Sequence, residues 1–238
     1  KIVSKILLKL KELSQPGTKL YEMESIASII LIANGAESYN KGYHPSWADR
    51  PYPSIICASI NEEAAHCPPK DKILQDGDIV KYDIGLTYKG RCADAALTVL
   101  VGNVSKEKRD LVKRTEEVLF VATQLVKDNL PIKTLTRTIQ NYMASYGYKA
   151  VRNYAGHAIG KEMHEKPPIP NYDDGHDYGF FKAGQVICIE PIFTTGKGKT
   201  ILKNDGWSVV TTDRRPVAQF ENMVLVKKDG YEVLTHHL

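Results

Sequence analysis

Residues 79–101 read IVKYDIGLTYKGRCADAALTVLV and contain two extended runs hinged at Lys89-Gly90. Apolar runs rich in β-branched and aromatic residues, joined by a short turn that contains glycine, are typical of a β-hairpin. If Lys89-Gly90 is a two-residue turn, residue 88 pairs with 91, 85 with 94, and Asp83 with Ala96. Asp83 and Asp94 then lie on one face as diagonal cross-strand neighbours, about 7–8 Å apart at Cα.

The pairing of these two acids makes the hairpin a candidate cation site. Two like charges at this spacing repel one another unless something neutralises them. One alternative is that both acids face solvent on the hairpin surface. The neighbouring positions, however, are mostly apolar: Ile79, Tyr82, Ile84, Ala95, Ala96 and Leu97. This composition indicates a well-buried hairpin, and a buried acid pair needs a cation.

Two helices are predicted before the hairpin. Apolar residues repeat at helical spacing over residues 1–13, and Gln15-Pro16-Gly17 ends that helix. Thr18 is placed to cap a second helix that runs to about Ala33, before the stop signal Asn34-Gly35. The segment that follows, to residue 76, is rich in Pro, Tyr and Asn, and it predicts loop around one strand at 53–60.

The same order begins again after Ser105, with helices predicted at about 106–128 and 134–146. The letters repeat as well, because GDIVKYD at residues 77–83 matches GQVICIE at 184–190, and both segments end on an acid. Glycine followed by aliphatic residues is also a common start for unrelated strands. The repeated order nevertheless favours one α+β domain over residues 1–238, made of two pseudo-symmetric helix-helix-hairpin halves around a curved antiparallel sheet, with the acids facing a shared cleft.

The composition excludes several classes of protein. The chain has 238 residues, of which 42% are hydrophobic and 25% charged, as in an ordinary globular protein. A net charge of +4 without any basic cluster gives no reason to expect nucleic acid, and the longest apolar run, residues 26–33, is far short of the roughly 20 residues of a membrane span. The four cysteines lack CxxC spacing, so we expect reduced thiols and a cytoplasmic location. A chain that begins at Lys1 leaves organellar targeting open.

Four acids and one histidine are candidate metal ligands. Segment 156–164, GHAIGKEMH, contains His157 and His164 among glycines, although a lone histidine is often structural. No HExxH motif is present, which excludes the helical single-zinc protease site. Glu190 precedes a proline at a strand end, and Glu221 lies in the strand-like stretch 217–226, where it could also be a solvated strand residue. With the hairpin pair, these acids carry four negative charges, which two divalent ions (Co, Mn, Fe or Zn) would neutralise.

Taken in order along the chain, these motifs resemble the type I methionine aminopeptidases, which have the pita-bread fold. The resemblance includes PYPSIICASINEEAAH at 51–66 and DGWSVVTTDRRPVAQFEN at 205–222. It implies that Asp83 binds one metal ion, that His157 and Glu190 bind the other, and that Asp94 and Glu221 bridge the two. A hydroxide between the metals would attack the peptide bond.

The resemblance also implies roles for residues outside the ligand set. Glu190 would carry the proton of the attacking water to the leaving amine, His164 would polarise the carbonyl, and His66 would lie near the scissile amide or the free amino group. The methionine pocket would be formed by Tyr52, Cys57, His66, Met163 and Trp207, and His164 would also bind the substrate. A thioether packs well against aromatic rings and sulfur atoms, so the physical chemistry agrees with this assignment.

Some positions depart from the usual letters of the family. They are Cys67-Pro68-Pro69, Ala158, Met163 and Asp49-Arg50-Pro51. These changes spare every expected ligand, so they affect the expected shape of the pocket more than the chemistry.

The expected function is removal of the initiator methionine from nascent chains whose second residue is small. The alternatives are a Xaa-Pro peptidase related to aminopeptidase P and prolidase, which usually carries an additional N-terminal domain, and a noncatalytic pita-bread binding protein, which would be expected to lack ligands. The expected partner is the N-terminal Met of a nascent polypeptide, with transient ribosome contact permitted through the domain's own surface. Neither a nucleic-acid motif nor a membrane segment is expected, and the chain is expected to be a monomer.

Overall fold

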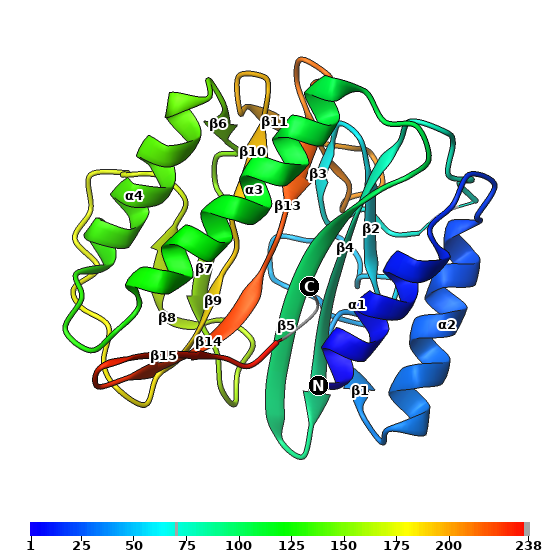
Figure 1. The fold of residues 1–238 in the computed structure, drawn as a ribbon. Coiled ribbons are helices and arrows are strands. Elements are labelled where there is room, and N and C mark those ends of the chain that lie inside the picture. The colour runs from blue at the N-terminus through cyan, green and yellow to red at the C-terminus, as the bar shows by residue number, and fades with distance from the viewer. Residues whose placement is uncertain (70, 236–238) are drawn as a thin grey trace.

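The computed structural model describes residues 1–69 and 71–235. Four helices lie on one side of a set of antiparallel sheets (Figure 1). The helices are α1 (Ile2–Leu13), α2 (Leu20–Ala33), α3 (Lys106–Leu125) and α4 (Ile132–Ser145). The strands of the first half are β1 (Glu37–Ser38), β2 (Cys57–Ile60), β3 (Glu63–Ala65), β4 (Ile79–Tyr88) and β5 (Arg91–Leu100). Those of the second half are β6 (Lys149–Ala150), β7 (Ala155–Ala158), β8 (Glu165–Pro170), β9 (Val186–Ile189), β10 (Ile192–Thr194), β11 (Thr200–Leu202), β12 (Val209–Thr211), β13 (Val217–Gln219), β14 (Asn222–Lys227) and β15 (Gly230–Val233).

All four helices occur where the periodicity predicts them, with differences at their ends. The predicted Thr18 cap of α2 is wrong, because the residue before the helix is Lys19 and no side chain caps it. The Thr18 hydroxyl instead donates to the Leu13 carbonyl (2.9 Å) and accepts from the Gln15 amide (3.2 Å), so it closes the turn between the two helices. Helix α4 starts two residues earlier than predicted, directly after Pro131, whose lack of an N–H is harmless there.

The hairpin register is confirmed. Strands β4 and β5 pair over ten residues each, with Tyr88 opposite Arg91 and Asp83 opposite Ala96. Lys89 and Gly90 have φ angles of 50° and 71°, and two positive values in succession are the geometry of a type I′ turn. The sequence therefore placed the two hairpin acids on one face correctly.

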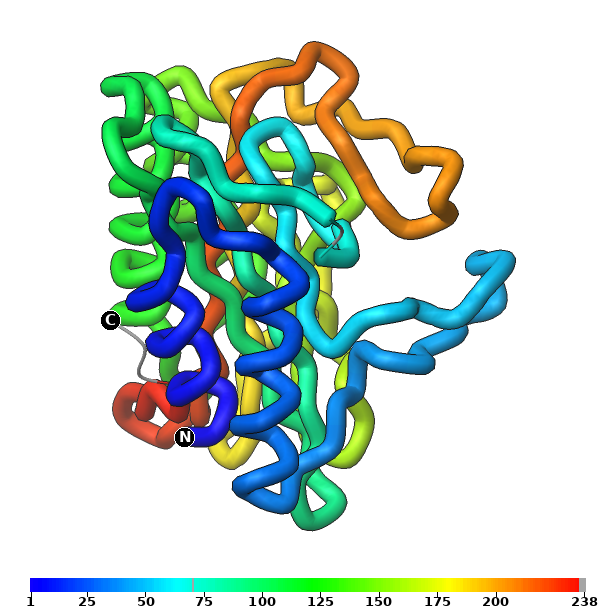
Figure 2. Tube along the Cα trace, turned by 90° about the vertical axis from the view of Figure 1, so that its right-hand side faces the viewer, coloured from blue at the N-terminus to red at the C-terminus, as the bar shows by residue number. Residues whose placement is uncertain are grey.

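The second half contains a similar pair of antiparallel strands that carries two acids, but a long connection replaces the tight turn. Strand β9 pairs with β14, and β10 pairs with β13, in one continuous register that leaves Glu190 opposite Glu221 between the two pairings. Here the paired strands are joined by a long excursion, residues 195–216, in place of a tight turn. This excursion and the segment around residues 39–52 extend away from the helices, as Figure 2 shows in orange and light blue.

The two halves meet along a seam between β5 and the strands β13 and β14. An isolated bridge pairs Ala96 with Glu221. Next to it, the Thr98 hydroxyl donates to the Gln219 carbonyl (2.7 Å) and accepts from the Gln219 amide (2.9 Å). Farther along, the buried Lys81 ammonium donates to the Asn61 and Val217 carbonyls at 2.9 and 3.0 Å. Polar side chains thus complete the seam where regular ladder bonds stop.

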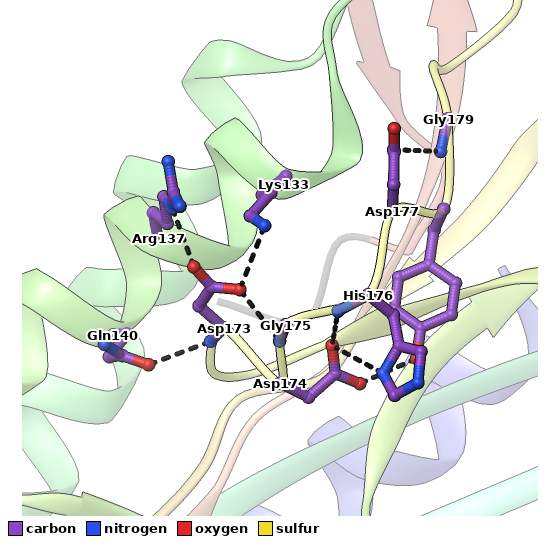
Figure 3. Close-up of polar contacts among 10 residues, drawn as sticks. Lys133, Arg137, Gln140, Asp173, Asp174, Gly175, His176, Asp177 and Gly179 are labelled. Atoms are coloured by element: carbon purple, nitrogen blue, oxygen red, sulfur yellow. Dashed lines mark hydrogen bonds and ion pairs between the residues drawn. The ribbon is translucent and has the colours of Figure 1, made fainter.

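The helices bury the back of the sheets. A continuous apolar core runs from α1 and α2 beneath the hairpin to α3 and α4 beneath the second half. The segment that leads into β9 is fixed to α4, because Asp173 accepts from Arg137 Nε (2.8 Å) and its amide donates to Gln140 (2.8 Å), with Lys133 3.6 Å away (Figure 3). Over residues 1–69 and 71–235, no helix combines the length and apolar character needed to cross a membrane.

Candidate metal centre

The strand register carries all four predicted acids to one face of the sheet. Asp83 is opposite Ala96, Ala96 is bridged to Glu221, and Glu221 lies opposite Glu190. Residues opposite one another in a sheet point to the same side, and so do alternate residues along a strand. Asp94, two residues from Ala96 along β5, therefore lies on the same face, diagonally across from Asp83.

The predicted histidine ligand reaches the same face from the neighbouring strand. His157 on β7 is opposite Cys188, two residues before Glu190. Gly156, directly before it, allows β7 to approach closely, since a Cβ there would lie 2.2 Å from the Cys188 carbonyl oxygen. The Lys161–Glu165 segment then returns His164 toward the site, with its ring centroid 4.6 Å from that of His157.

Two overlapping groups of side chains have the spacing of metal ligands. In one group, ligand atoms of Asp83, Asp94 and Glu221 all lie within 4.8 Å of one another. In the other, His157, Cys188 and Glu221 meet the same limit. Glu221 belongs to both groups, which is the placement expected of a bridging carboxylate. Glu190 belongs to neither, but it lines the same cavity.

Burial and mutual repulsion disfavour negative charge at these carboxyl groups. Burial, followed by the nearby Asp94, raises the pKa of Asp83 to about 8, while a hydrogen bond from Gln219 (3.0 Å) opposes the shift. Burial raises the pKa of Asp94 to about 6. The pKa values of Glu190 and Glu221 are raised well above the usual range, first by burial and then by the neighbouring acids. Divalent cations would relieve both causes.

Two buried carboxylate oxygen atoms are left without a hydrogen-bond donor and are available as metal ligands. Asp94 Oδ1 and Glu221 Oε1 have no hydrogen-bond partner, and their residues are only 8% and 2% exposed. Most buried carboxylate oxygens in native proteins are paired, because an unpaired one carries the full desolvation penalty. Oxygen ligands with one imidazole suit several divalent transition metals. The side chains of the site thus match a metal centre.

The histidines that are not expected to be ligands are held as neutral imidazoles. Burial, and then the nearby His164, lowers the pKa of His66 to about 4. The pKa of His164 is lowered by burial and by its neighbour His157, although part of its ring faces the open cavity. A neutral imidazole offers one N–H donor and one acceptor nitrogen. Each ring can therefore donate to a substrate carbonyl or accept from an amine.

All eleven residues expected at the site line one cavity of about 570 Å³. They are Tyr52, Cys57, His66, Asp83, Asp94, His157, Met163, His164, Glu190, Trp207 and Glu221. The apolar end is formed by Trp207 and Tyr52, both 3% exposed, whose rings meet edge-on at 5.0 Å. Cys57 packs in the same cluster, so this end combines aromatic faces with a sulfur atom.

The structure adds residues that the sequence analysis did not place. Gln219 was quoted only as part of a motif, but it lies two residues before Glu221, on the same face, and holds Asp83. Because side chains alternate between the two faces of a strand, the position of Gln219 two residues before Glu221 could have identified it as a residue of the site. Cys188 is expected from the sequence only as one of four reduced thiols, and it lies beside the predicted ligands His157 and Glu221. Tyr154, which contacts the His66 ring edge-on at 5.7 Å, carries no signal in the sequence pattern.

Comparison with known proteins shows the same relationship over nearly the whole chain. Residues 1–228 match the model of metallopeptidase family M24. The methionine aminopeptidase of Mycoplasma capricolum subsp. capricolum is 37% identical over 240 residues, covering 99% of this chain and 93% of that protein. The crystal structure of methionine aminopeptidase from Thermotoga maritima superposes with a TM-score of 0.94 at 33% identity, covering 99% of this chain and 92% of that one.

A more distant neighbour shares the fold alone. Prolidase from Pyrococcus furiosus has a TM-score of 0.75 at 22% identity, and the match covers 99% of this chain but 60% of that one. The closer similarity to the methionine aminopeptidases favours the main functional prediction over the Xaa-Pro alternative. The M24 relationship implies divalent metals, which agrees with the acid cluster and its unpaired oxygens. The chain belongs to metallopeptidase family M24 and has its pita-bread fold.

Proposed function

We propose that this protein removes methionine from the N-terminus of polypeptides whose second residue is small, using two divalent metal ions. The observation that carries the proposal is the pair of unpaired, buried oxygens on Asp94 and Glu221 in a cavity that also holds an apolar, sulfur-containing end. A cavity of this kind combines ligands for metal with a place for a methionine side chain. We also propose that residues 1–238 form one catalytic domain.

Asp94 and Glu221 would be shared by both ions, with Asp83 on one side and His157 and Glu190 on the other. Metal ions bound there would polarise the scissile carbonyl and lower the pKa of a water molecule toward neutrality. Their positive charge would also offset the repulsion that, after burial, raises the pKa values of Asp83, Glu190 and Glu221. Several metals share these ligand preferences, so availability would decide among Co, Mn, Fe and Zn.

Three side chains would handle the substrate and its proton. Glu190, half-buried directly after β9, would be ionised by the positive charge of bound metal and would then accept the proton of the water and release it to the leaving amine. His164, neutral and open to the cavity, would donate an N–H to the developing oxyanion. His66, on the cavity wall and held edge-on by Tyr154, would lie near the scissile amide or the amino group.

The apolar end of the cavity supports selection of methionine. The Tyr52 and Trp207 rings meet edge-on, and Cys57 packs with them and is paired with Asp83 across β2 and β4. Met163 lines the same cavity, and its Cε lies 2.7 Å from the place a Cβ on Gly85 would take. A flexible thioether gains from contact with aromatic edges and other sulfur atoms. A β-branched or charged first residue would fill this space poorly.

The test uses metal-stripped protein to which Mn, Fe, Co or Zn is returned singly. Release of the first residue is measured from Met-Ala-Ser, Met-Leu-Ser and Ala-Pro-Ala. We expect methionine release from Met-Ala-Ser only, and only with metal. Asp94→Asn should lose both metal binding and turnover, while Asp229→Asn, which changes an exposed acid in the β14–β15 turn, should retain both.

Each contrary outcome has its own meaning. Cleavage confined to Ala-Pro-Ala would assign the protein to the proline-specific enzymes. Absence of cleavage with every metal would favour a noncatalytic binding role. Full activity in Asp94→Asn would refute the dinuclear proposal.

A further inference from the structure

Two segments form the outer rim of the cavity, on the side away from the helices. Figure 2 shows both extending from the body of the protein, residues 39–52 in light blue and the excursion between β10 and β13 in orange. Each contributes a large apolar side chain that lines the cavity and remains open to solvent. Trp47 is 58% exposed and Leu202 is 53% exposed.

The Trp47 segment is held in place against the inner pocket. Trp207 Nε1 donates to the Arg50 carbonyl (3.1 Å), and the Trp47 and Trp207 rings meet edge-on with centroids 5.2 Å apart. The Tyr52 amide donates to the Tyr43 carbonyl (2.8 Å) and the Gly42 amide donates to the Tyr52 carbonyl (2.9 Å), which closes the base of the segment. The exposed indole is therefore fixed relative to the pocket.

Exposure separates the outer tryptophan from the inner one. Trp207 is 3% exposed and faces the apolar end, whereas Trp47 stands at the mouth of the same cavity. A single exposed apolar residue is ordinary. Here two large exposed ones, from separate segments, line the same cavity, so they offer contact surface to whatever occupies it. Any peptide whose first residue fills the inner end must leave past this rim.

We propose that Trp47 and Leu202 bind the substrate chain beyond its second residue, as a two-sided clamp for an extended peptide. The inference rests on the proposed function and adds a length requirement to it. Aromatic and aliphatic side chains contact backbone and apolar groups with little sequence demand, so the clamp suits unfolded chains of varied sequence. An apolar or aromatic side chain at the third or fourth position would gain most.

The experiment compares wild type with Trp47→Ala, Trp47→Phe and Leu202→Gln on Met-Ala and Met-Ala-Ser-Phe. In Trp47→Ala we expect the ratio of KM values, tetrapeptide over dipeptide, to rise about three- to tenfold, the range of one aromatic contact, while kcat for the tetrapeptide stays the same. Trp47→Phe should restore most of the loss, and Leu202→Gln should show a smaller rise. Phe120→Ala, which changes a side chain 66% exposed on α3, is the matched control and should leave the ratio unchanged.

A second readout measures equilibrium binding of the tetrapeptide to metal-free protein by calorimetry, so that the inference does not depend on turnover. Weaker binding by Trp47→Ala than by wild type supports the clamp even if wild type releases no methionine, an outcome that would refute the proposed function alone. Equal affinities and an unchanged KM ratio in Trp47→Ala would overturn the clamp and leave the proposed function standing.

Discussion

Replacement of Asp83 by Asn is predicted to stabilise the metal-free protein and to destabilise it relative to wild type when metal is present. Asn keeps the size of the side chain and an oxygen that can accept the hydrogen bond from Gln219. It removes an ionisable carboxyl group, whose ionisation is opposed by burial and by the nearby Asp94. A residue kept for metal binding should show this reversal, whereas a structural carboxylate should not.

The magnitude follows from the pKa of Asp83, which is raised from 3.8 to about 8. At pH 7 the unfolded chain has lost this proton, whereas the folded protein still holds it. The relevant interval is the one from the unfolded pKa of 3.8 to pH 7, about three pH units. At about 1.36 kcal/mol per unit, the folded state is penalised by about 4 kcal/mol at pH 7 and by about 2 kcal/mol at pH 5. Asp94 shares the repulsion, so an advantage of about 2–4 kcal/mol is expected for the variant at pH 7.

The sign of the pH dependence is also fixed. A carboxyl group whose folded pKa is raised binds more protons folded than unfolded, so it contributes stability at low pH that is lost as pH rises from 3.8 toward 8. The advantage of Asp83→Asn should therefore grow between pH 5 and pH 8 and then level off. Asp229→Asn, at an exposed position, is the matched control and should show no such growth.

The assay is thermal unfolding in chelator and in excess metal, across this pH range. For a chain of this length, 2–4 kcal/mol corresponds to a rise in Tm of roughly 5–15 °C. Metal at 1,000 times its Kd adds about 4 kcal/mol to a protein that binds it. This gain matches or exceeds the advantage of the variant, and the variant should lose it. A metal-free Asp83→Asn variant that is less stable than wild type at pH 7, or an advantage that does not change with pH, would refute the reasoning.

Three further substitutions test separate parts of the site. His164→Ala should lower kcat by about 10²–10³ through loss of an oxyanion donor while leaving metal content, measured by elemental analysis, unchanged; lost metal would make the histidine a ligand. Gly156→Ala would place a Cβ 2.2 Å from the Cys188 carbonyl oxygen, so we expect a loss of about 1–3 kcal/mol in urea unfolding together with weaker metal binding. Thr98→Val removes a hydroxyl that both donates to and accepts from the backbone of β13, and it should lower the free energy of unfolding by about 1–3 kcal/mol with normal KM.

Much of the site could be predicted because it is built on strand alternation. A two-residue turn at Lys89-Gly90 fixes the hairpin register, and the register then fixes which side chains share a face with Asp83. The repeated GDIVKYD and GQVICIE segments locate the second acid, Glu190, by the same arithmetic. Local rules suffice wherever a single turn and a period of two determine the direction of a side chain.

The remainder depends on long-range contacts that no local pattern encodes. Nothing in the spacing of the cysteines connects Cys188 with the site, and only the pairing of β7 with β9 places it opposite His157. Trp47 lies in a stretch that predicts only loop, and its place at the cavity mouth depends on Trp207, whose indole N–H fixes the segment from 157 residues away. The Thr18 cap failed for a similar reason, because the hydroxyl found partners in the turn before the helix.

The position of the site on the seam between the two halves links metal binding to folding. Asp83 and Asp94 come from the first half, Glu190 and Glu221 from the second, and the isolated bridge to Ala96 runs directly between the two pairs. Without metal, ionisation of these acids would place like charges on both sides of the seam, so Asp83, Glu190 and Glu221 keep their protons to higher pH. An ion shared by Asp94 and Glu221 would turn the same contact into an attraction. The pseudo-symmetric fold thus places the acids where one bound cation can both take part in the chemistry and hold the halves together. Metal affinity and the stability of the seam should therefore change together in any variant of the Asp83–Asp94 pair or of the Glu190–Glu221 pair.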